Sequence, residues 1–98
     1  MNTEICRAIR EYRLIELRYG WGQRIVEPHA YGRNQMGHDL LRCYQVAGAS
    51  KSGKLIGWKI LRLDAVTNLH VLDKNFSRSR PKYERGDKAL NAQIYCEL

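Results

Sequence analysis

Arginine and aromatic side chains alternate within two segments that otherwise have the composition of strands. In LLRCYQ, Arg42 and Tyr44 occupy alternate positions, and in GWKILRLD the same is true of Trp58 and Arg62. Because alternate residues of a strand point to the same face, each segment places a guanidinium on a face that also carries an aromatic ring. Such a combination suits the recognition of phosphates and planar ligands.

Arg62 lies in a stretch that is mostly apolar, and three surroundings are open to it. It is an exposed edge residue, an ion-pair partner of Asp64, or the positive anchor of a site for an anionic ligand. A buried guanidinium without a partner is costly, and Asp64 lies two residues away on the same face. The residues alone favour the structural pair and leave the ligand site open.

The histidines and cysteines do not predict a metal site, a cofactor or a disulfide framework. The three His and three Cys are widely spaced, and none falls at Cys-x-x-Cys or His-x-x-x-His spacing. We therefore expect Cys6 and Cys43 to be core thiols. No paired carboxylates and no local signature of a nucleophile stand out, which predicts a protein that is not an enzyme.

The stretch GASKSGK superficially resembles a phosphate-binding loop. It lacks the second spaced glycine pattern, and a strand rather than a helix follows it. A phosphate loop needs the amides of that helix, so we reject a nucleotide-binding loop there.

Positive charge concentrates in the second half of the chain. The net charge is +7, of which +5 falls in residues 50–98, and the densest run is KNFSRSRPKYERGDK at 74–88. Its aromatic residues Phe76 and Tyr83 lie between the basic ones. Basic groups displace phosphate counterions and rings stack on bases, which favours a polyanion as partner. A solvated loop whose charge serves solubility is the alternative.

The periodicity of apolar residues predicts one helix followed by strands. Residues 3–12 repeat at helical spacing, and residues 14–72 contain strands joined by turns, one of them at 49–54. Residues 73–91 form a basic loop and residues 92–98 a closing strand. Pro28 marks its strand as an edge strand or a bent one. The predicted fold is mainly β with one N-terminal helix: a single domain, 1–98, forming a small, strongly bent SH3-like or Sm-like barrel of five to six strands.

No run of residues has the length and apolarity of a membrane span or of a signal peptide. This predicts a cytoplasmic protein that does not contact a membrane.

The ordered set VEPHAYG, LLRCYQVAG, GWKILRLDAV and KNF resembles the WYL domain over about residues 5–76. The triplet that names the family falls here on Asp39-Leu40-Leu41. The resemblance implies an Sm-like or SH3-like barrel that senses nucleic acids or nucleotide-like anions in bacterial transcription regulators. It matches His29, Arg42 and Arg62 to family positions, and it raises Arg62 as an anion contact.

These observations predict a non-enzymatic regulatory or accessory domain that binds nucleic acid, single-stranded by preference, or a nucleotide-like anion. Because 98 residues leave no room for a helix-turn-helix beside the barrel, a stand-alone accessory protein in phage defence or CRISPR-linked control is expected. A homodimer and a larger regulatory partner are further possibilities. The alternative is a protein-interaction or oligomerisation barrel that binds no nucleic acid. The expected contacts are Arg62, Arg42, His29, Tyr44, Lys59, Arg24, Arg78, Arg80 and Lys82.

Overall fold

The computed structural model describes residues 1–49 and 55–98, so most of the predicted turn at 49–54, and with it most of GASKSGK, lies outside the described residues. One short helix precedes six strands. The elements are α1 (Thr3–Arg10), β1 (Arg13–Tyr19), β2 (Gly22–Arg33), β3 (Asp39–Gly48), β4 (Gly57–Arg62), the 3-10 turn η1 (Leu63–Ala65), β5 (Val66–Asn75) and β6 (Gln93–Glu97).

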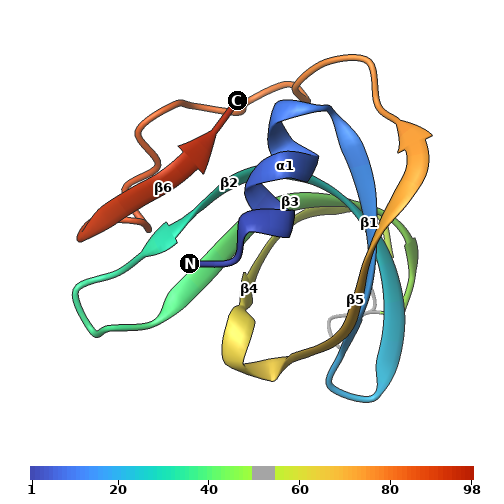
Figure 1. The fold of residues 1–98 in the computed structure, drawn as a ribbon, viewed down its shortest axis with the longest axis horizontal. Helices are drawn as coiled ribbons and strands as arrows, with labels where there is room; N and C mark the ends of the chain where they lie inside the picture. The colour runs from blue at the N-terminus through green and yellow to red at the C-terminus, as the bar shows by residue number, and fades with distance from the viewer. Residues whose placement is uncertain (50–54) are drawn as a thin grey trace.

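The strands form one antiparallel sheet in the order β4-β3-β2-β1-β5, and β6 pairs with the far end of β2. Figure 1 shows this sheet curling around α1, with η1 forming the corner between β4 and β5. Over the described residues β4 and β5 do not pair with each other, so the sheet is not closed. The predicted class, mainly β with one N-terminal helix, is confirmed.

Helix α1 is fixed by its cap and by one apolar face. The Asn2 side chain accepts hydrogen bonds from the amides of Glu4 and Ile5, which satisfies two of the free donors at the helix start. The apolar face is buried as predicted, through Ile5, Ala8 and Ile9. The helix ends at Arg10, two residues before the predicted end, and Tyr12 takes a positive φ of 56° in the turn that follows.

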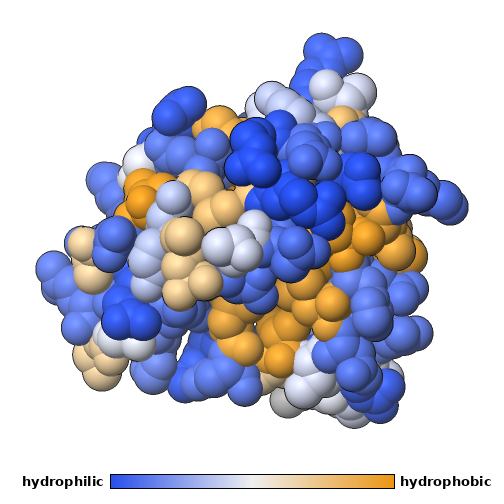
Figure 2. Space-filling model, in the orientation of Figure 1, coloured by the Kyte–Doolittle hydropathy of each residue, from blue (hydrophilic) through white to orange (hydrophobic). Residues whose placement is uncertain are grey.

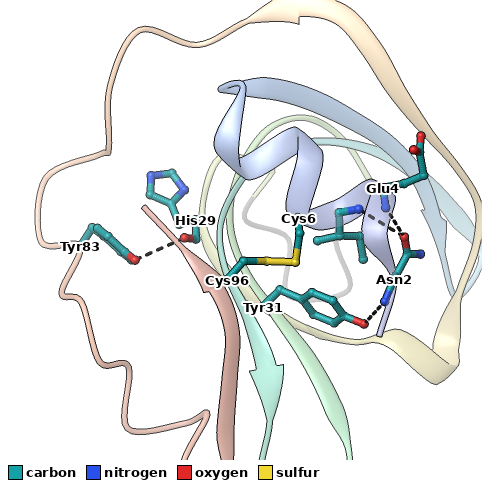
Figure 3. The surroundings of a disulfide bond; sticks show 8 residues. Asn2, Glu4, Cys6, His29, Tyr31, Tyr83 and Cys96 are labelled. Atoms are coloured by element: carbon teal, nitrogen blue, oxygen red, sulfur yellow. Dashed lines mark hydrogen bonds between the residues drawn. A yellow bond between two sulfur atoms is a disulfide. The ribbon is translucent and has the colours of Figure 1, made fainter.

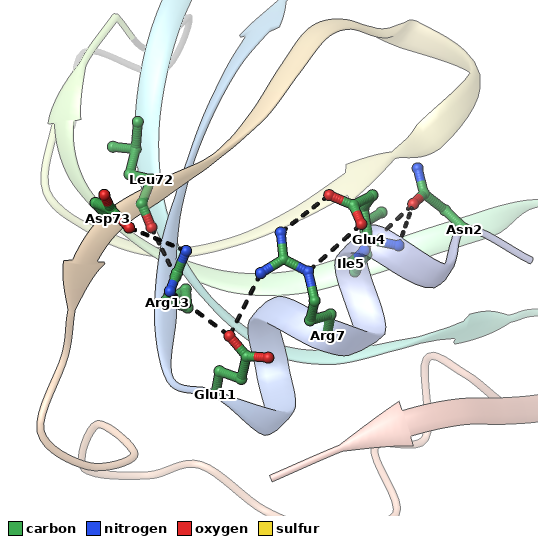
Figure 4. A network of polar contacts seen from close by, with 8 residues as sticks. All are labelled: Asn2, Glu4, Ile5, Arg7, Glu11, Arg13, Leu72 and Asp73. Atoms are coloured by element: carbon green, nitrogen blue, oxygen red, sulfur yellow. Dashed lines mark hydrogen bonds and ion pairs between the residues drawn. The ribbon is translucent and has the colours of Figure 1, made fainter.

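The opposite face of α1 carries a chain of ion pairs. Arg7 pairs with Glu4 and Glu11, and Arg13 pairs with Glu11 and with Asp73 of β5 (Figure 4). In the surface view, hydrophilic residues lie over the helix and hydrophobic residues lie below it, toward η1 (Figure 2). Within the described residues, no helix is long and apolar enough to cross a bilayer.

The core lies between α1 and the concave face of the sheet. Strand residues at alternate positions supply it, as the period-two pattern predicts. The buried side chains that α1 covers are Ile15, Leu17, Val26, Tyr31, Leu41, Cys43 and Leu61.

Pro28 lies where β2 changes partners. Val26 is the last residue of β2 that pairs with β1, and Ala30 is the first that pairs with β6. The register with β3 shifts between Pro28 and Ala30, so the predicted bend is confirmed. The other alternative, an edge strand, does not apply, because β2 has neighbours on both sides. The missing amide of Pro28 falls in the gap between β1 and β6.

A disulfide joins Cys6 of α1 to Cys96 of β6 (Figure 3), with the two Cα atoms 5.7 Å apart. The prediction of a protein without disulfides, with Cys6 as a core thiol, is therefore wrong. The two residues lie 90 positions apart in the sequence, and only the pairing of β6 with β2 brings them together. Cys43 is a buried free thiol as predicted, and burial raises its pKa to about 12.

Candidate ligand-binding site

Residues 76–91, called the strap from here on, connect β5 to β6 across the outer face of the sheet. This face carries side chains that alternate with the core residues of β2, β3 and β4. The strap contacts all three strands: Arg80 pairs with Glu27, Asp87 with Arg42, and the carbonyl of Pro81 accepts a hydrogen bond from the indole of Trp58. The basic segment is therefore irregular, as predicted, but it is attached to the sheet.

His29 lies beneath the strap and is fully buried. Its Nε2 is 3.0 Å from the backbone nitrogen of Arg80, which is a donor, so Nε2 accepts. The proton then sits on Nδ1, which donates to the carbonyl of Glu27 over 2.9 Å. The ring contacts Trp58, Phe76 and Tyr83. Both nitrogens are thus engaged within the protein, and burial lowers the pKa of His29.

Arg80 has a buried partner, Glu27, although the Arg80 side chain itself is partly exposed. Its guanidinium makes two hydrogen bonds to the Glu27 carboxylate, of 2.8 and 3.0 Å. It also lies 4.4 Å from the centre of the Tyr44 ring. Tyr44 in turn packs edge-on against Trp58. Arg80 and Tyr44 therefore hold the strap on the sheet.

Arg62 is exposed, at the end of the edge strand β4. Its side chain is 50% exposed, and one guanidinium nitrogen lies 2.5 Å from the Asp64 carboxylate. Two of the three predicted surroundings therefore hold together: Arg62 is an exposed residue of an edge strand, and it is the ion-pair partner of Asp64. The apolar neighbours Leu61 and Leu63 pack toward the core, whereas Arg62 points away from it.

Arg42 lines a cavity between the strap and the sheet. It contacts Asp87 of the strap at 2.6 Å. The cavity has a volume of about 270 Å³. The residues that line it are Arg42, Trp58, Lys82, Tyr83, Glu84, Asp87 and Lys88.

Two aromatic rings face this cavity in a nearly parallel arrangement. The centroids of Trp58 and Tyr83 are 6.2 Å apart, with 23° between the ring planes. The Tyr83 hydroxyl is anchored on the carbonyls of His29 and Leu98 (the first bond is drawn in Figure 3). Burial raises the pKa of Tyr83 to about 12, so the hydroxyl stays protonated and keeps donating.

A second hollow, of about 450 Å³, adjoins the first and shares Lys88 with it. Ile60 and Arg62 line this hollow, and both lie on the same face of β4 as Trp58. We call the combined depression the β4 groove: Trp58, Ile60 and Arg62 lie along the strand, and Tyr83 and Lys88 lie on the strap.

The remaining predicted contacts lie elsewhere. Arg78 lines a separate hollow beside Phe76, and Lys59 is on the other face of β4, at the position paired with Cys43. Arg24 is buried, with its guanidinium 4.9 Å from the Tyr19 ring centre and a hydrogen bond to Gln45. Among the described residues, its Nε has no hydrogen-bond partner.

Of the predicted residues, the structure brings Arg42, Lys82 and Arg62 to the groove. Lys88 belongs to the basic run that was expected to contact a polyanion. Sequence reasoning missed Glu84 and Asp87 as residues of the site, although both lie within that run. Within residues 1–49 and 55–98, no group of three or more His, Cys, Asp or Glu side chains is arranged to hold a metal ion.

Comparison of the chain with protein-family models, with curated proteins and with solved structures found no match in any of the three. The case for a function therefore comes from the geometry of the groove and from the sequence.

Proposed function

We propose that the chain is a non-enzymatic binding module that holds single-stranded nucleic acid, or a nucleotide, in the β4 groove. The observation that carries the proposal is the nearly parallel pair Trp58 and Tyr83 in a cavity bordered by Lys82 and Lys88. Stacking rings beside cations are the two elements that single-strand binders combine.

The ring geometry suits a base. A base stacks on the exposed part of Trp58 without any movement of the protein. Insertion between the two rings requires about 6.8 Å between the ring planes, twice the stacking repeat of nucleic acid. The two rings, whose centroids are now 6.2 Å apart, have to separate to admit a base.

The cations line the same cavity as the stacking rings, beside the position where the phosphates of a bound nucleotide would lie. Lys82 and Lys88 make no ion pair among the described residues, so their ammonium groups are available to phosphates. Arg62 lies in the adjoining hollow, and its pair with Asp64 is exposed. An exposed pair of this kind contributes little to stability, so exchanging Asp64 for a phosphate costs little.

The fold part of the proposal is that the curled sheet is an open form of an SH3-like or Sm-like barrel. The ordered motifs support placing the chain with the regulatory or accessory domains of the WYL type, with His29, Arg80 and Tyr44 as supports of the groove rather than as ligand contacts.

The test is fluorescence polarisation with labelled single- and double-stranded oligonucleotides, on the wild type and on Trp58→Leu. Loss of one stacking contact costs about 1–3 kcal/mol, so we expect Kd for single strands to rise about fivefold or more. Trp21→Leu is the matched control, because Trp21 is 63% exposed in the β1–β2 turn. Circular dichroism checks that both variants fold. Equal affinity of the two variants would remove Trp58 from the interface.

The second candidate is a protein-interaction or oligomerisation module. It is favoured by the exposed apolar side chains of Leu55, Ile56 and Ile60, which lie on or just before an edge of β4 that pairs with no strand of the described residues. Such an edge is a template for pairing. Light scattering on the purified protein separates the two: a stable dimer that binds no oligonucleotide supports the second.

A further inference from the structure

We propose that Glu84 makes the β4 groove select guanine. The inference rests on the proposed function and goes beyond it, because it assigns base preference to one side chain. Glu84 lines the same cavity as the stacking pair Trp58 and Tyr83. It is a carboxylate in a site that is otherwise suited to an anion.

Glu84 differs from the other carboxylates near the groove. Asp87 is engaged by Arg42 at 2.6 Å and by the amide of Ala89 at 3.0 Å. Asp64 is paired with Arg62. In the part of the chain that the structure describes, Glu84 has neither a hydrogen bond nor an ion pair. Both of its oxygens are therefore available as acceptors.

A carboxylate at this position does not help to attract a polyanion, because it repels phosphate. Its chemical use in such a site is to accept hydrogen bonds from a neutral donor. With Trp58 and Tyr83 against the flat faces of a base, the other walls of the cavity meet the edge of the base. Glu84 follows Tyr83 in the chain and lines the cavity, so it belongs to those walls.

Guanine is the base whose Watson–Crick edge matches two acceptor oxygens. Its N1–H and its 2-amino group are adjacent donors, which a carboxylate accepts in the same paired geometry that it uses with arginine. Adenine and cytosine place a ring-nitrogen acceptor beside their amino group. Uracil and thymine flank their single N–H with two carbonyls. In each of these, an acceptor of the base faces an oxygen of the carboxylate.

The experiment is isothermal titration of the full chain with the four ribonucleoside monophosphates, for the wild type and for Glu84→Gln. Glutamine keeps the size of the side chain but offers one acceptor and one donor group. A good bidentate contact discriminates between bases by about fivefold or more, so we expect the wild type to bind GMP at least about fivefold more tightly than UMP. The variant loses this ratio, and it binds UMP as well as or better than the wild type because a repulsive charge is gone.

Glu16→Gln is the matched control, because Glu16 lies on β1 and lines neither hollow of the groove; it should keep the preference for GMP. Nucleotide binding with equal affinity for the four bases, or a preference that survives in Glu84→Gln, would overturn the role of Glu84 and leave the proposed function in place. A failure of every nucleotide and oligonucleotide to bind overturns both.

Discussion

Arg62, Arg80 and Arg24 carry the same guanidinium group but have three different surroundings. Arg62 pairs with an exposed Asp64, Arg80 pairs with a buried Glu27, and Arg24 is itself buried against Tyr19. A sequence gives the spacing of a possible ion pair but not the solvent exposure of its members. The free energy that each arginine contributes is therefore set by the fold.

We expect Arg80→Ala to lower the free energy of unfolding far more than Arg62→Ala. The first change leaves the Glu27 carboxylate, which is 7% exposed, without its partner. Hydrogen bonds to charged groups contribute about 1.5–3 kcal/mol. The second removes an exposed pair worth about 0–1 kcal/mol. Urea denaturation of the two variants measures the difference. Equal losses would mean that Arg80 does not anchor the strap.

The neutral state of His29 makes stability depend on pH. Burial lowers its pKa in the folded protein, so the unfolded chain, with an ordinary value of about 6.5, takes up the proton first as the pH falls. The stabilisation is complete above about pH 6.5 and is lost below it, because stability rises with pH wherever the unfolded state binds more protons. Burial outweighs the Glu27 carbonyl and carboxylate, which raise the pKa of His29, and the charge of Arg80 adds to the lowering.

We therefore expect the urea concentration at the midpoint of unfolding to decrease as the pH is lowered from about 7.5 to about 5.5. These values bracket the ordinary histidine pKa of about 6.5. His29→Gln should flatten this dependence. His70→Gln is the control, since it leaves His29 in place and should retain the slope. The same slope in both variants would show that other groups cause the pH dependence.

At the scale of elements, the strap is the part that the sequence predicted least completely. Its few apolar residues, with Pro81 and Gly86, correctly indicate irregular backbone. Its anchors could not be predicted, because Arg42 and Asp87 are 45 positions apart and Glu27 and Arg80 are 53 apart. For the strand residues of the candidate site, the sequence predicted which face of the sheet each side chain occupies. For the strap residues it did not predict a position.

The disulfide ties α1 to β6, and β6 in turn holds the strap. Glu97 accepts from the amide of Gly86 and pairs with Arg85. Closing so long a loop constrains the unfolded chain, and native disulfides contribute about 2–4 kcal/mol. The bond therefore supports one wall of the groove through a neighbouring strand.

Counting thiols tests this arrangement. In protein purified without reductant we expect no reactive thiol in the folded state, because Cys43 is buried and its pKa is raised to about 12. One thiol should react after denaturation, and three after denaturation with reductant. Cys6→Ser should lower Tm. Three thiols in denatured, unreduced protein would show that the disulfide does not form.

At the scale of the whole molecule, local patterns predicted the fold class but not the closure of the sheet. Ile5, Ala8 and Ile9 at helical spacing and Ile15 and Leu17 at alternate positions defined the faces that are buried. These are local signals, and each element carries its own. Whether β4 and β5 pair depends on how far the whole sheet curls, which no single segment determines.

The distribution of charge over the whole molecule leads to the last prediction. The chain has a net charge of +7. Among residues 1–49 and 55–98, three cations line the β4 groove without a buried or half-buried partner: Lys82, Lys88 and Arg62. Each phosphate contact to a single strand contributes about 0.7 to the slope of log K against log salt. Binding confined to the groove therefore gives a slope of about −2.

The double variant Lys82→Gln/Lys88→Gln should reduce this slope to about −0.7, because one phosphate contact remains. Arg10→Gln/Arg18→Gln removes the same net charge from α1 and β1 and should keep a slope near −2. Fluorescence polarisation over a range of salt concentrations measures both. If the two double variants flatten the slope equally, the positive charge acts over the whole surface, and the β4 groove is not the site that binds the phosphates.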